Sequence, residues 1–252
     1  MNIVITGSEG YVARNLIEKI AVKHRIYEFN SDSWNNPGEY GADWRSFLGS
    51  IPPKIDYVVH LGAIADSGHT DFDILQANTL ATASIARGLP FGTRLIFFSS
   101  CAAIKPVTLY GWSKHLAEEL VKSILVDREQ YCILRPYNIY GGDESEKVNP
   151  SLVWKIKNLG ALKVYSDFVR DFVHVDDVCK AVLYLIFCEW QPGIYDLGTG
   201  DPTTAIELYE RLKGESPKDV VPRPEGIDPY LVASKSRMLK GVYCRKEYED
   251  ES

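Results

Sequence analysis

Residues 2–13, Asn2-Ile3-Val4-Ile5-Thr6-Gly7-Ser8-Glu9-Gly10-Tyr11-Val12-Ala13, decide the fold. An apolar strand over Asn2 to Ile5 runs into a glycine turn, and an apolar pattern of helical period comes next, over residues 16–20. Glycines let the backbone turn sharply and approach a pyrophosphate, which N–H groups at the start of the next helix bind. The spacing Gly-x-x-Gly-x-x-Ala keeps a small residue, Ala13, where helix and strand pack closely. The stretch therefore predicts a dinucleotide site on an α/β sheet.

The second predicted strand, Arg25 to Phe29, ends at Asn30, about where a carboxylate commonly binds the adenosine ribose of NAD. That carboxylate is missing. Asn30 and the serines after it hydrogen-bond a ribose or a 2′-phosphate without repelling it, and Arg14 is close in sequence. Asp43, in the loop before Trp44, is either an acceptor for the adenine amino group or a solvated acidic residue. The sequence thus leaves NAD and NADP open.

Another informative stretch is Tyr110-Gly111-Trp112-Ser113-Lys114. On a helix, residues four apart share a face, so an ammonium lies beside a phenol and favours its ionised form. A tyrosine tuned in this way exchanges protons with a sugar hydroxyl or ketone near neutral pH. By itself the pair is weak evidence, because Tyr and Lys also occur at this spacing on solvated helix faces. Its weight depends on the other motifs of the chain.

Composition excludes several classes of partner. The chain has 252 residues, 45% of them apolar and 25% charged, and a net charge of -6, which creates no field that attracts nucleic acid or an anionic membrane. Its five cysteines form no C-x-x-C pair and indicate reduced, mostly buried thiols. No basic segment followed by an apolar core marks a signal peptide, and the longest apolar run, Ala181 to Cys188, is too short to span a bilayer. We therefore expect a cytoplasmic protein.

Further elements are predicted from periodicity and breakers. Strands are expected at Ile55 to Leu61, Arg94 to Ser100, Leu162 to Tyr165 and Gly193 to Leu197, and helices at Phe72 to Arg87, Pro150 to Leu159, Asp176 to Trp190, Thr203 to Lys213 and, briefly, Ser234 to Leu239. Hydroxyls at the end of a parallel strand point into the ligand crevice, which singles out Ser99-Ser100-Cys101. The five histidines lack metal-ligand spacing, and Asp176-Asp177 suits a helix N-terminus, so no metal site is predicted.

Eight motifs in a fixed order make the chain resemble the extended short-chain dehydrogenase/reductase family, in particular its NAD(P)-dependent nucleotide-sugar epimerase/dehydratase branch. They are Thr6-Gly7-x-x-Gly10-Tyr11; Asp56-Tyr57-Val58-Val59-His60-Leu61-Gly62-Ala63; Asn78-x-x-Ala81-Thr82; Ser99-Ser100; Tyr110-x-x-Ser113-Lys114-x-x-x-Glu118; Leu134-Arg135-Pro136-Tyr137-Asn138-Ile139-Tyr140-Gly141; Arg170-Asp171-Phe172-Val173-His174-Val175-Asp176-Asp177; and Gly193-Ile194-Tyr195-Asp196-Leu197-Gly198, with Asp43 in the adenine loop. The resemblance implies a Rossmann-type doubly wound parallel sheet with a small C-terminal substrate-binding lobe.

The resemblance also implies roles for individual residues. Tyr110 is the expected acid/base, Lys114 lowers its pKa and holds the nicotinamide ribose, and Ser100 hydrogen-bonds the reacting oxygen. Counting back from Ile104 instead places Cys101 at the serine position, and the loop from Ser100 to Tyr110 is shorter than in relatives. The cofactor, NAD or NADP, is expected at Gly7, Gly10, Tyr11, Val12, Asn30, Asp43, Trp44, Leu61, Gly62, Ala63, Asn78, Tyr110, Lys114 and Pro136.

For the substrate, a nucleotide-diphosphate sugar, the resemblance implies contacts from Asn138 and Arg170. A guanidinium matches phosphate oxygens bidentately, although Arg170-Asp171 also suits a local ion pair. We expect residues 1–137 and about 168–197 to form the cofactor domain, and about 138–167 and 198–252 a small lobe in which the family's closing helices are mostly absent. A homodimer through the helices that start near Phe72 and Tyr110 is also expected.

The residues after Ser100 narrow the choice of reaction. Sugar dehydratases of this type carry an Asp-Glu pair there, whereas this chain has Ala102-Ala103, or Cys101-Ala102, and without carboxyls the elimination lacks its acid and base. A 4-epimerase needs only the tyrosine, a hydroxyl partner and a nicotinamide that takes hydride and returns it. A 4-ketoreductase uses the same groups with exchangeable NADPH. We favour the epimerase, with the ketoreductase or a non-catalytic NAD(P)-binding sensor as alternatives.

Overall fold

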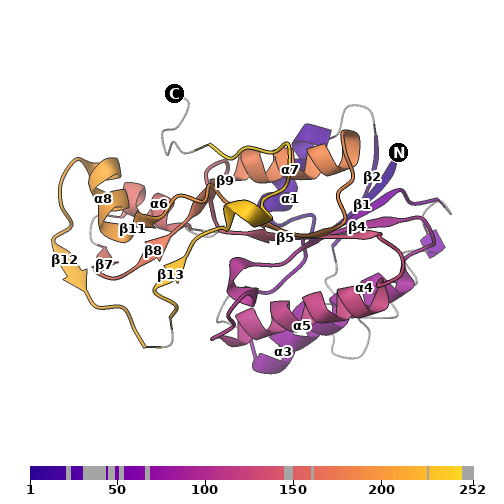
Figure 1. The fold of residues 1–252 in the computed structure, drawn as a ribbon, viewed down its shortest axis with the longest axis horizontal. Helices are drawn as coiled ribbons and strands as arrows, with labels where there is room; N and C mark the ends of the chain where they lie inside the picture. Colours follow the sequence, from indigo (N-terminus) through magenta and orange to yellow (C-terminus); the bar gives the residue numbers. More distant parts are fainter. Residues whose placement is uncertain are drawn as a thin grey trace.

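A computed structural model of the chain describes residues 1–20, 24–30, 44, 49–50, 54–65, 69–144, 150–159, 162–225 and 227–245. Their centre is a six-stranded sheet in which every pair of neighbours is parallel, in the order β10-β5-β4-β3-β1-β2 (Figure 1). Its strands are β1 (Asn2–Thr6), β2 (Arg25–Phe29), β3 (Tyr57–His60), β4 (Arg94–Phe98), β5 (Tyr131–Pro136) and β10 (Gly193–Leu197). Because β1 lies between β2 and β3, the chain reverses its direction of winding there, and ligands of such sheets bind beside that point.

Helices cover both faces of this sheet, as Figure 1 shows. Alternate strand residues, such as Ile3 and Ile5, pack on α1 (Tyr11–Ile20) and α7 (Val175–Phe187), while those between them, such as Val4 and Val58, face the opposite layer. That second layer consists of α3 (Asp71–Leu75), a π-helical turn η2 (Gln76–Leu80), α4 (Ala81–Gly88) and α5 (Leu109–Ile124). The architecture confirms the predicted Rossmann-type α/β fold.

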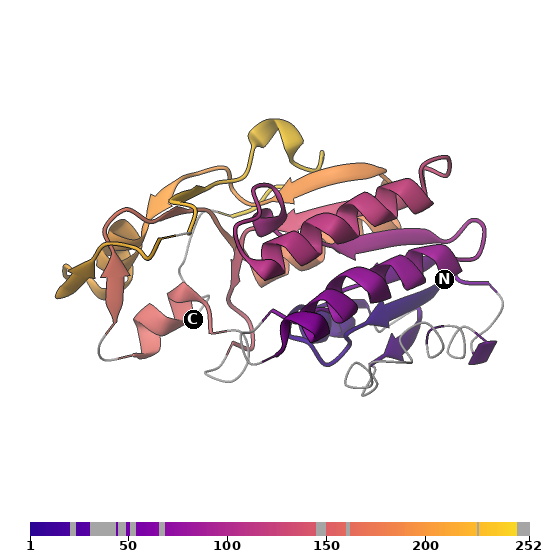
Figure 2. The ribbon, with the colours of Figure 1, turned by 90° about the horizontal axis from the view of Figure 1, so that it is seen from below.

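The C-terminal lobe lies beyond the carboxyl ends of the strands (Figures 1 and 2). Its helices are α6 (Leu152–Asn158) and α8 (Ala205–Lys213), and its short sheets contain β7 (Lys163–Tyr165) with β12 (Asp219–Val221), and β8 (Val169–Arg170) between β11 (Thr203–Thr204) and β13 (Tyr230–Leu231). Strands β6 (Asn138–Tyr140) and β9 (Phe172–His174) pair in parallel where the lobe meets the central sheet. Short 3-10 turns are η3 (Cys101–Ala103) and η4 (Lys235–Arg237). The proposed domain boundaries stay a prediction.

Most predicted elements are confirmed, and β2 and β10 have the predicted bounds. One is corrected: the single helix expected over Phe72 to Arg87 is interrupted by the π-helical turn η2, which carries Asn78. All five cysteines are free, and Cys101, Cys132 and Cys179 are buried. In the part of the chain that the structure describes, no helix is long and apolar enough to cross a membrane.

Candidate active site

A cavity of about 390 Å³ opens where β1, β4 and β5 end. It is lined by the glycine turn, by the ends of β3 and β4, by the first turns of α5 and by the segment after β5; the residues are Gly7, Gly10, Tyr11, Val12, Ala13, Leu61, Ala63, Ala65, Phe98, Ser99, Ser100, Cys101, Tyr110, Lys114, Pro136, Tyr137, Asn138 and Ile139. Five motifs that are far apart in the sequence thus contribute to one space.

The glycine turn fits a pyrophosphate. Gly7 has φ +66°, and a Cβ there would lie 2.6 Å from the Cα of Gly62, so only glycine lets the two backbones approach. The Gly10 N–H donates to the Gly7 carbonyl, which closes the turn, and α1 begins directly afterwards at Tyr11, in the wall of the cavity. A helix N-terminus of this kind binds anions. Gly7, Gly10 and Tyr11 therefore suit the diphosphate of a dinucleotide.

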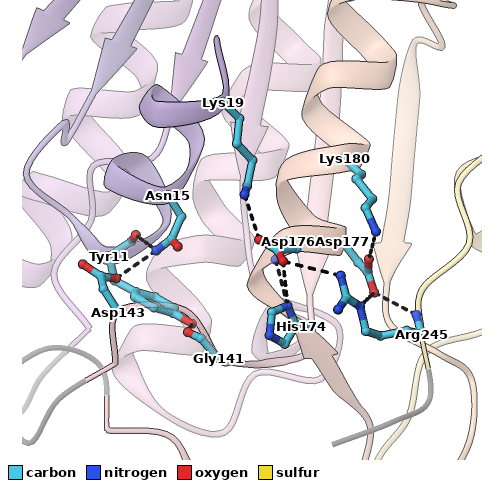
Figure 3. Close-up of polar contacts among 10 residues, drawn as sticks. All are labelled: Tyr11, Asn15, Lys19, Gly141, Asp143, His174, Asp176, Asp177, Lys180 and Arg245. Carbon is cyan, nitrogen blue, oxygen red and sulfur yellow. Dashed lines mark hydrogen bonds and ion pairs between the residues drawn. The ribbon is translucent and has the colours of Figure 1, made fainter. Parts of the chain in front are cut away.

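The first turns of α1 are bound to the loop after β6 (Figure 3). The Tyr11 hydroxyl donates to the Gly141 carbonyl, and the Asn15 amide donates to Asp143 at 2.9 Å. The Arg14 guanidinium also donates to Asp143, at 2.7 Å from its terminal nitrogen. Arg14 is thus paired within the chain.

The start of α7 forms a second ionic cluster in the same view (Figure 3). Asp176 accepts from Lys19 at 2.9 Å, and Asp177 accepts from Lys180 at 2.8 Å and from the Arg245 backbone N–H at 2.8 Å. The two aspartates therefore hold α1 and the C-terminal segment to the start of α7, which agrees with their predicted place at a helix N-terminus.

Tyr110, in the first turn of α5, lies beside Ser100, which follows the end of β4. The Ser100 hydroxyl lowers the pKa of Tyr110, but burial has the larger effect and raises that pKa to about 12. The Ser100 hydroxyl also caps the 3-10 turn after β4, accepting from the Ala102 N–H at 3.2 Å. The phenol is therefore protonated at neutral pH in this geometry.

Lys114 is buried about one helical turn after Tyr110 on α5. Its amine donates to the Phe98 carbonyl at 2.8 Å and lies 5.0 Å from the centre of the Phe97 ring. Burial lowers the pKa of Lys114 to about 7, and the Glu118 carboxylate opposes that change. Lys114 lines the same cavity as Tyr110, and the lowering of the tyrosine's pKa by this lysine stays a prediction.

A directed chain of hydrogen bonds joins Thr6, directly before the glycine turn, to His60 and Thr82. The Thr82 hydroxyl donates to the Asn78 carbonyl at 2.7 Å, so it accepts from the Nε2 of His60 at 2.8 Å. The Nδ1 of His60 then accepts from Thr6, at 2.6 Å, directly before the glycine turn. Burial lowers the pKa of His60 to about 3, so its ring is neutral. This chain connects β1, β3 and the helical layer.

Asn78 extends the chain to α5. The side chain of Asn78 accepts from the Ile64 N–H through Oδ1 and donates to the Ile64 carbonyl through Nδ2, at 2.8 Å each, beyond the end of β3. The same Nδ2 also donates to the Ser113 hydroxyl at 3.0 Å. Ser113 in turn donates to the Tyr110 carbonyl at 2.8 Å. Asn78 is therefore placed to support the loop after β3 and the start of α5.

A second cavity of about 200 Å³ lies in the lobe and shares Asn138 with the first. Its lining contains two cations, Lys155 and Lys163, and the aromatic rings of Tyr165 and Phe168, with Leu152, Val164, Phe172 and Ala205. The Asn138 amide donates to the Asp171 carbonyl at 2.6 Å, which fixes it at the junction. The two spaces together suit a long ligand with an anionic part and a flat ring.

A model of the NAD dependent epimerase/dehydratase family matches residues 3–198. The chain belongs to this family. Membership confirms the predicted resemblance, an enzyme of the extended short-chain dehydrogenase type, and its NAD(P) cofactor, which the glycine turn fits.

Solved structures share the fold. A UDP-glucose 4-epimerase of Thermotoga maritima with UDP-glucose matches with a TM-score of 0.78 and 20% identity, over 93% of this chain and 90% of that one. Pal from Bacillus thuringiensis matches with 0.80 and 20%, over 99% and 96%. A dTDP-4-dehydrorhamnose reductase of Clostridium acetobutylicum matches with 0.73 and 19%, over 94% and 91%.

The structure brings most of the predicted site residues together, but not all. Gly7, Gly10, Tyr11, Val12, Leu61, Ala63, Ser100, Tyr110, Lys114, Pro136 and Asn138 line the first cavity, and Gly62 contacts Gly7. Asn30 is exposed directly after β2, and Asp43 lies outside the described residues. Trp44 packs in the core edge-on to Phe29, with ring centres 5.6 Å apart. The cofactor roles of Asn30, Asp43 and Trp44 stay predictions.

Arg170 is buried, and its guanidinium donates to the carbonyls of Val169, Asp228 and Pro229. It also lies over the Phe168 ring at 3.5 Å, so it supports a wall of the lobe cavity. Asp171 binds the backbone of Thr199 and Gly200 instead of Arg170. The two lysines of this cavity were missed from the sequence because lysines on a short amphipathic helix and on a short strand look like solvated positions. Contact of Arg170 with a substrate stays a prediction.

Proposed function

We propose that this family member is a nucleotide-sugar 4-epimerase. The observation that carries the proposal is that Tyr110, Ser100 and Lys114 line one cavity with the glycine turn, and that Asn138 joins this cavity to the cationic one in the lobe. Such a layout suits a cofactor in the first space and a nucleotide diphosphate in the second, with the sugar between them. Proteins of this fold were solved with UDP-glucose and with UDP-glucuronic acid, together with NAD, which supports UDP-sugars as first probes.

The lining of the first cavity argues against a dehydratase. Among its described residues there is no aspartate or glutamate, and Ala102 and Ala103 form the turn after Ser100. Elimination of water from a sugar needs an acid and a base besides Tyr110. Transfer of a hydride at one carbon and of a proton at its oxygen needs no acid or base besides Tyr110, so epimerisation or reduction fits better.

In the proposed reaction the side chains of this chain handle the proton. Tyr110 takes it from the sugar 4-hydroxyl and returns it to the same oxygen after inversion, and Ser100 orients that oxygen. Bound NAD(P) supplies the acceptor and donor of hydride. Lys114 holds the nicotinamide ribose and, when charged, favours the phenolate. Asn138 lies where the sugar joins the diphosphate.

A 4-ketoreductase is the second candidate, and one observation favours it. Because burial raises the pKa of Tyr110 to about 12, the phenol is poised to donate a proton, which is the direction that ketone reduction needs. The two reactions differ in their use of cofactor. The epimerase interconverts two sugars with no net change in nicotinamide absorbance, whereas the reductase consumes one NADPH for each ketone.

The first experiment is a thermal-shift screen of UDP-, GDP- and dTDP-sugars with NAD or NADP present. A shift by a nucleotide sugar, followed by turnover that Tyr110→Phe abolishes while NAD(P) binding persists, supports an enzyme of this type. A shift by NAD(P) and by no nucleotide sugar supports the rival, a cofactor-binding sensor. Full turnover by the Tyr110→Phe protein would remove Tyr110 as the acid/base.

We also propose a cytoplasmic homodimer. Exposed apolar side chains occur on the helices named for the interface, with Phe72 and Leu80 on α3 and η2, and Trp112 and Leu116 on α5. The five free cysteines agree with a reducing compartment.

A further inference from the structure

The lobe cavity of about 200 Å³ has a positively charged lining. Lys155 comes from α6 and Lys163 from β7, and every other described residue of the lining is uncharged. In the part of the chain that the structure describes, neither ammonium donates a hydrogen bond or forms an ion pair. Because charge-assisted hydrogen bonds to an anion are strong, two unpaired ammonium groups at one cavity suit an anionic ligand.

The carboxylates beside these lysines do not neutralise them. Asp167, between β7 and β8, forms an ion pair with Arg223 at 2.9 Å. Asp219 is the neighbour of Lys163 across β12 and β7, but it is exposed and does not line the cavity. The lining therefore keeps the positive charge of its two lysines.

Arg170 is a third cation of this region, and it is bound within the protein. Its guanidinium donates to three backbone carbonyls, those of Val169, Asp228 and Pro229, at 2.8, 2.8 and 3.2 Å. It also covers one face of the Phe168 ring. Arg170 is 3% exposed and lines neither of the two cavities. To contact a ligand it would have to give up three hydrogen bonds and the ring contact, whereas the lysines would give up none.

These contacts give Arg170 a structural task in the wall of the cavity. Strand β8, which carries Arg170, pairs with β13, and the two carbonyls from residues 228 and 229 come directly before β13 (Figure 1). The guanidinium thus joins this turn to Phe168, whose ring lies edge-on to Tyr165 with ring centres 5.7 Å apart. Both rings line the cavity, where they suit the flat ring of a nucleobase.

We propose that Lys155 and Lys163 bind the diphosphate of the substrate, and that Arg170 supports the aromatic wall instead of contacting phosphate. The inference rests on the proposed function, which assigns a nucleotide diphosphate to the lobe cavity. Each phosphoryl group of that diphosphate carries one negative charge, and an ammonium binds such a charge as a point cation. The two lysines therefore match the ligand in number and in sign.

The test separates the phosphates from the nucleoside. The probes are UDP, GDP and dTDP, titrated by calorimetry into the full chain saturated with NAD(P), and their nucleosides, which are titrated by ligand-observed NMR. The nucleoside Kd divided by the diphosphate Kd measures what the phosphates contribute to binding. We expect Lys155→Met and Lys163→Met each to lower this ratio by about tenfold, and the double variant by about 10²-fold, with little change in the nucleoside Kd.

Matched variants separate a phosphate contact from other effects of charge and folding. Lys218→Met removes the same charge from an exposed position before β12, outside the cavity lining, and should leave both Kd values unchanged. In Arg170→Gln we expect both Kd values to rise by a similar factor, because the wall loosens, so that the ratio stays within about threefold of its native value. Arg170→Lys, which keeps the charge but loses the planar fork, serves if Arg170→Gln does not fold, with the same expectation.

Three results would overturn the proposal. They are a native ratio in the folded double lysine variant, a ratio that falls about tenfold or more in a folded Arg170 variant, and a wild-type protein that binds none of the three nucleoside diphosphates. The proposed function fails on a different measurement, the turnover of nucleotide sugars. Diphosphate binding that depends on Lys155 and Lys163, in a protein that turns over no nucleotide sugar, would support this inference and remove the epimerase.

Discussion

Ser100 and Cys101 are neighbours at the end of β4, both line the cavity, and the sequence left open which of them is the partner of Tyr110. Ser100 lowers the pKa of Tyr110 whereas Cys101 raises it, and burial raises the pKa of the Cys101 thiol to about 11, so Ser100 is the partner that we propose. We expect Ser100→Ala to lower kcat by about 10²-fold, the scale of a positioned proton-transfer group, because the pKa of Tyr110 rises further without the Ser100 hydroxyl. Steady-state rates of Ser100→Ala and Cys101→Ala give the comparison. A larger loss in Cys101→Ala would transfer the role to the thiol.

His60 makes the folding stability of the chain depend on pH. Its pKa is about 3 in the folded protein, against an ordinary value of 6.5, so between these values the unfolded chain binds a proton that the folded chain does not. Stability attributable to His60 is therefore fully present above pH 6.5 and is lost as pH falls, by at most about 1.4 kcal/mol for each pH unit. Urea unfolding at pH 7 and at pH 5.5 measures it.

The matched variants for this prediction are His60→Gln, which cannot titrate, and His69→Gln, at an exposed position. We expect the acid sensitivity to shrink in the first and to persist in the second. Equal sensitivity in all three proteins would show that carboxylates elsewhere, and not His60, set the response. The sequence identified His60 only as part of a motif, because its neutral state depends on burial among Thr6 and Thr82 from two other elements.

At the scale of elements, the turn between β1 and α1 depends on contact with the loop after β3. Gly7→Ala combines a positive φ with a Cβ that would lie 2.6 Å from the Gly62 Cα. We expect a loss of about 1–3 kcal/mol in the free energy of unfolding, the usual cost of such strain, together with loss of NAD(P) binding. Gly92→Ala is the control, because it has φ +87° and open space around it. Chemical denaturation and NAD(P) titration of both variants test the prediction, and similar losses in both would reduce the effect to backbone strain.

The helix predicted over Phe72 to Arg87 shows where local sequence stops being informative. Apolar periodicity located the helix, but the π-helical turn depends on Asn78 binding the backbone of Ile64 and the hydroxyl of Ser113. These partners come from other parts of the chain, so no local pattern predicts them. By contrast, β2 and β10 had their predicted bounds because local residues mark their ends: Pro192 and Gly198 flank β10, and Asn30 follows β2.

For the whole molecule, the motifs predicted the sheet, and most residues expected at the cofactor line one cavity, since they lie at strand ends and the fold collects strand ends along one edge. The lobe side was predicted less well. Arg170 was chosen for its charge, yet backbone carbonyls from residues 228 and 229 accept its hydrogen bonds, and Lys155 and Lys163 line the cavity. Which cation faces a cavity is decided by how α6 and the short strands of the lobe pack, and sequence spacing does not encode that packing.

Assembly is the remaining property of the whole molecule, and we propose that the surface of α3, η2 and α5 decides it. Phe72, Leu80, Trp112 and Leu116 are each between 42% and 57% exposed on these adjoining helices, and burying such side chains favours association. We expect a dimer by light scattering and a monomer for Trp112→Glu with Leu116→Glu, because two carboxylates on each chain would be desolvated in the interface. Phe91→Glu is the control: Phe91 is 93% exposed in the loop between α4 and β4, outside the helices named for the interface, and its variant should remain a dimer. A wild-type monomer at micromolar concentration would contradict the dimer, and a dimer that survives the double substitution would place the interface elsewhere.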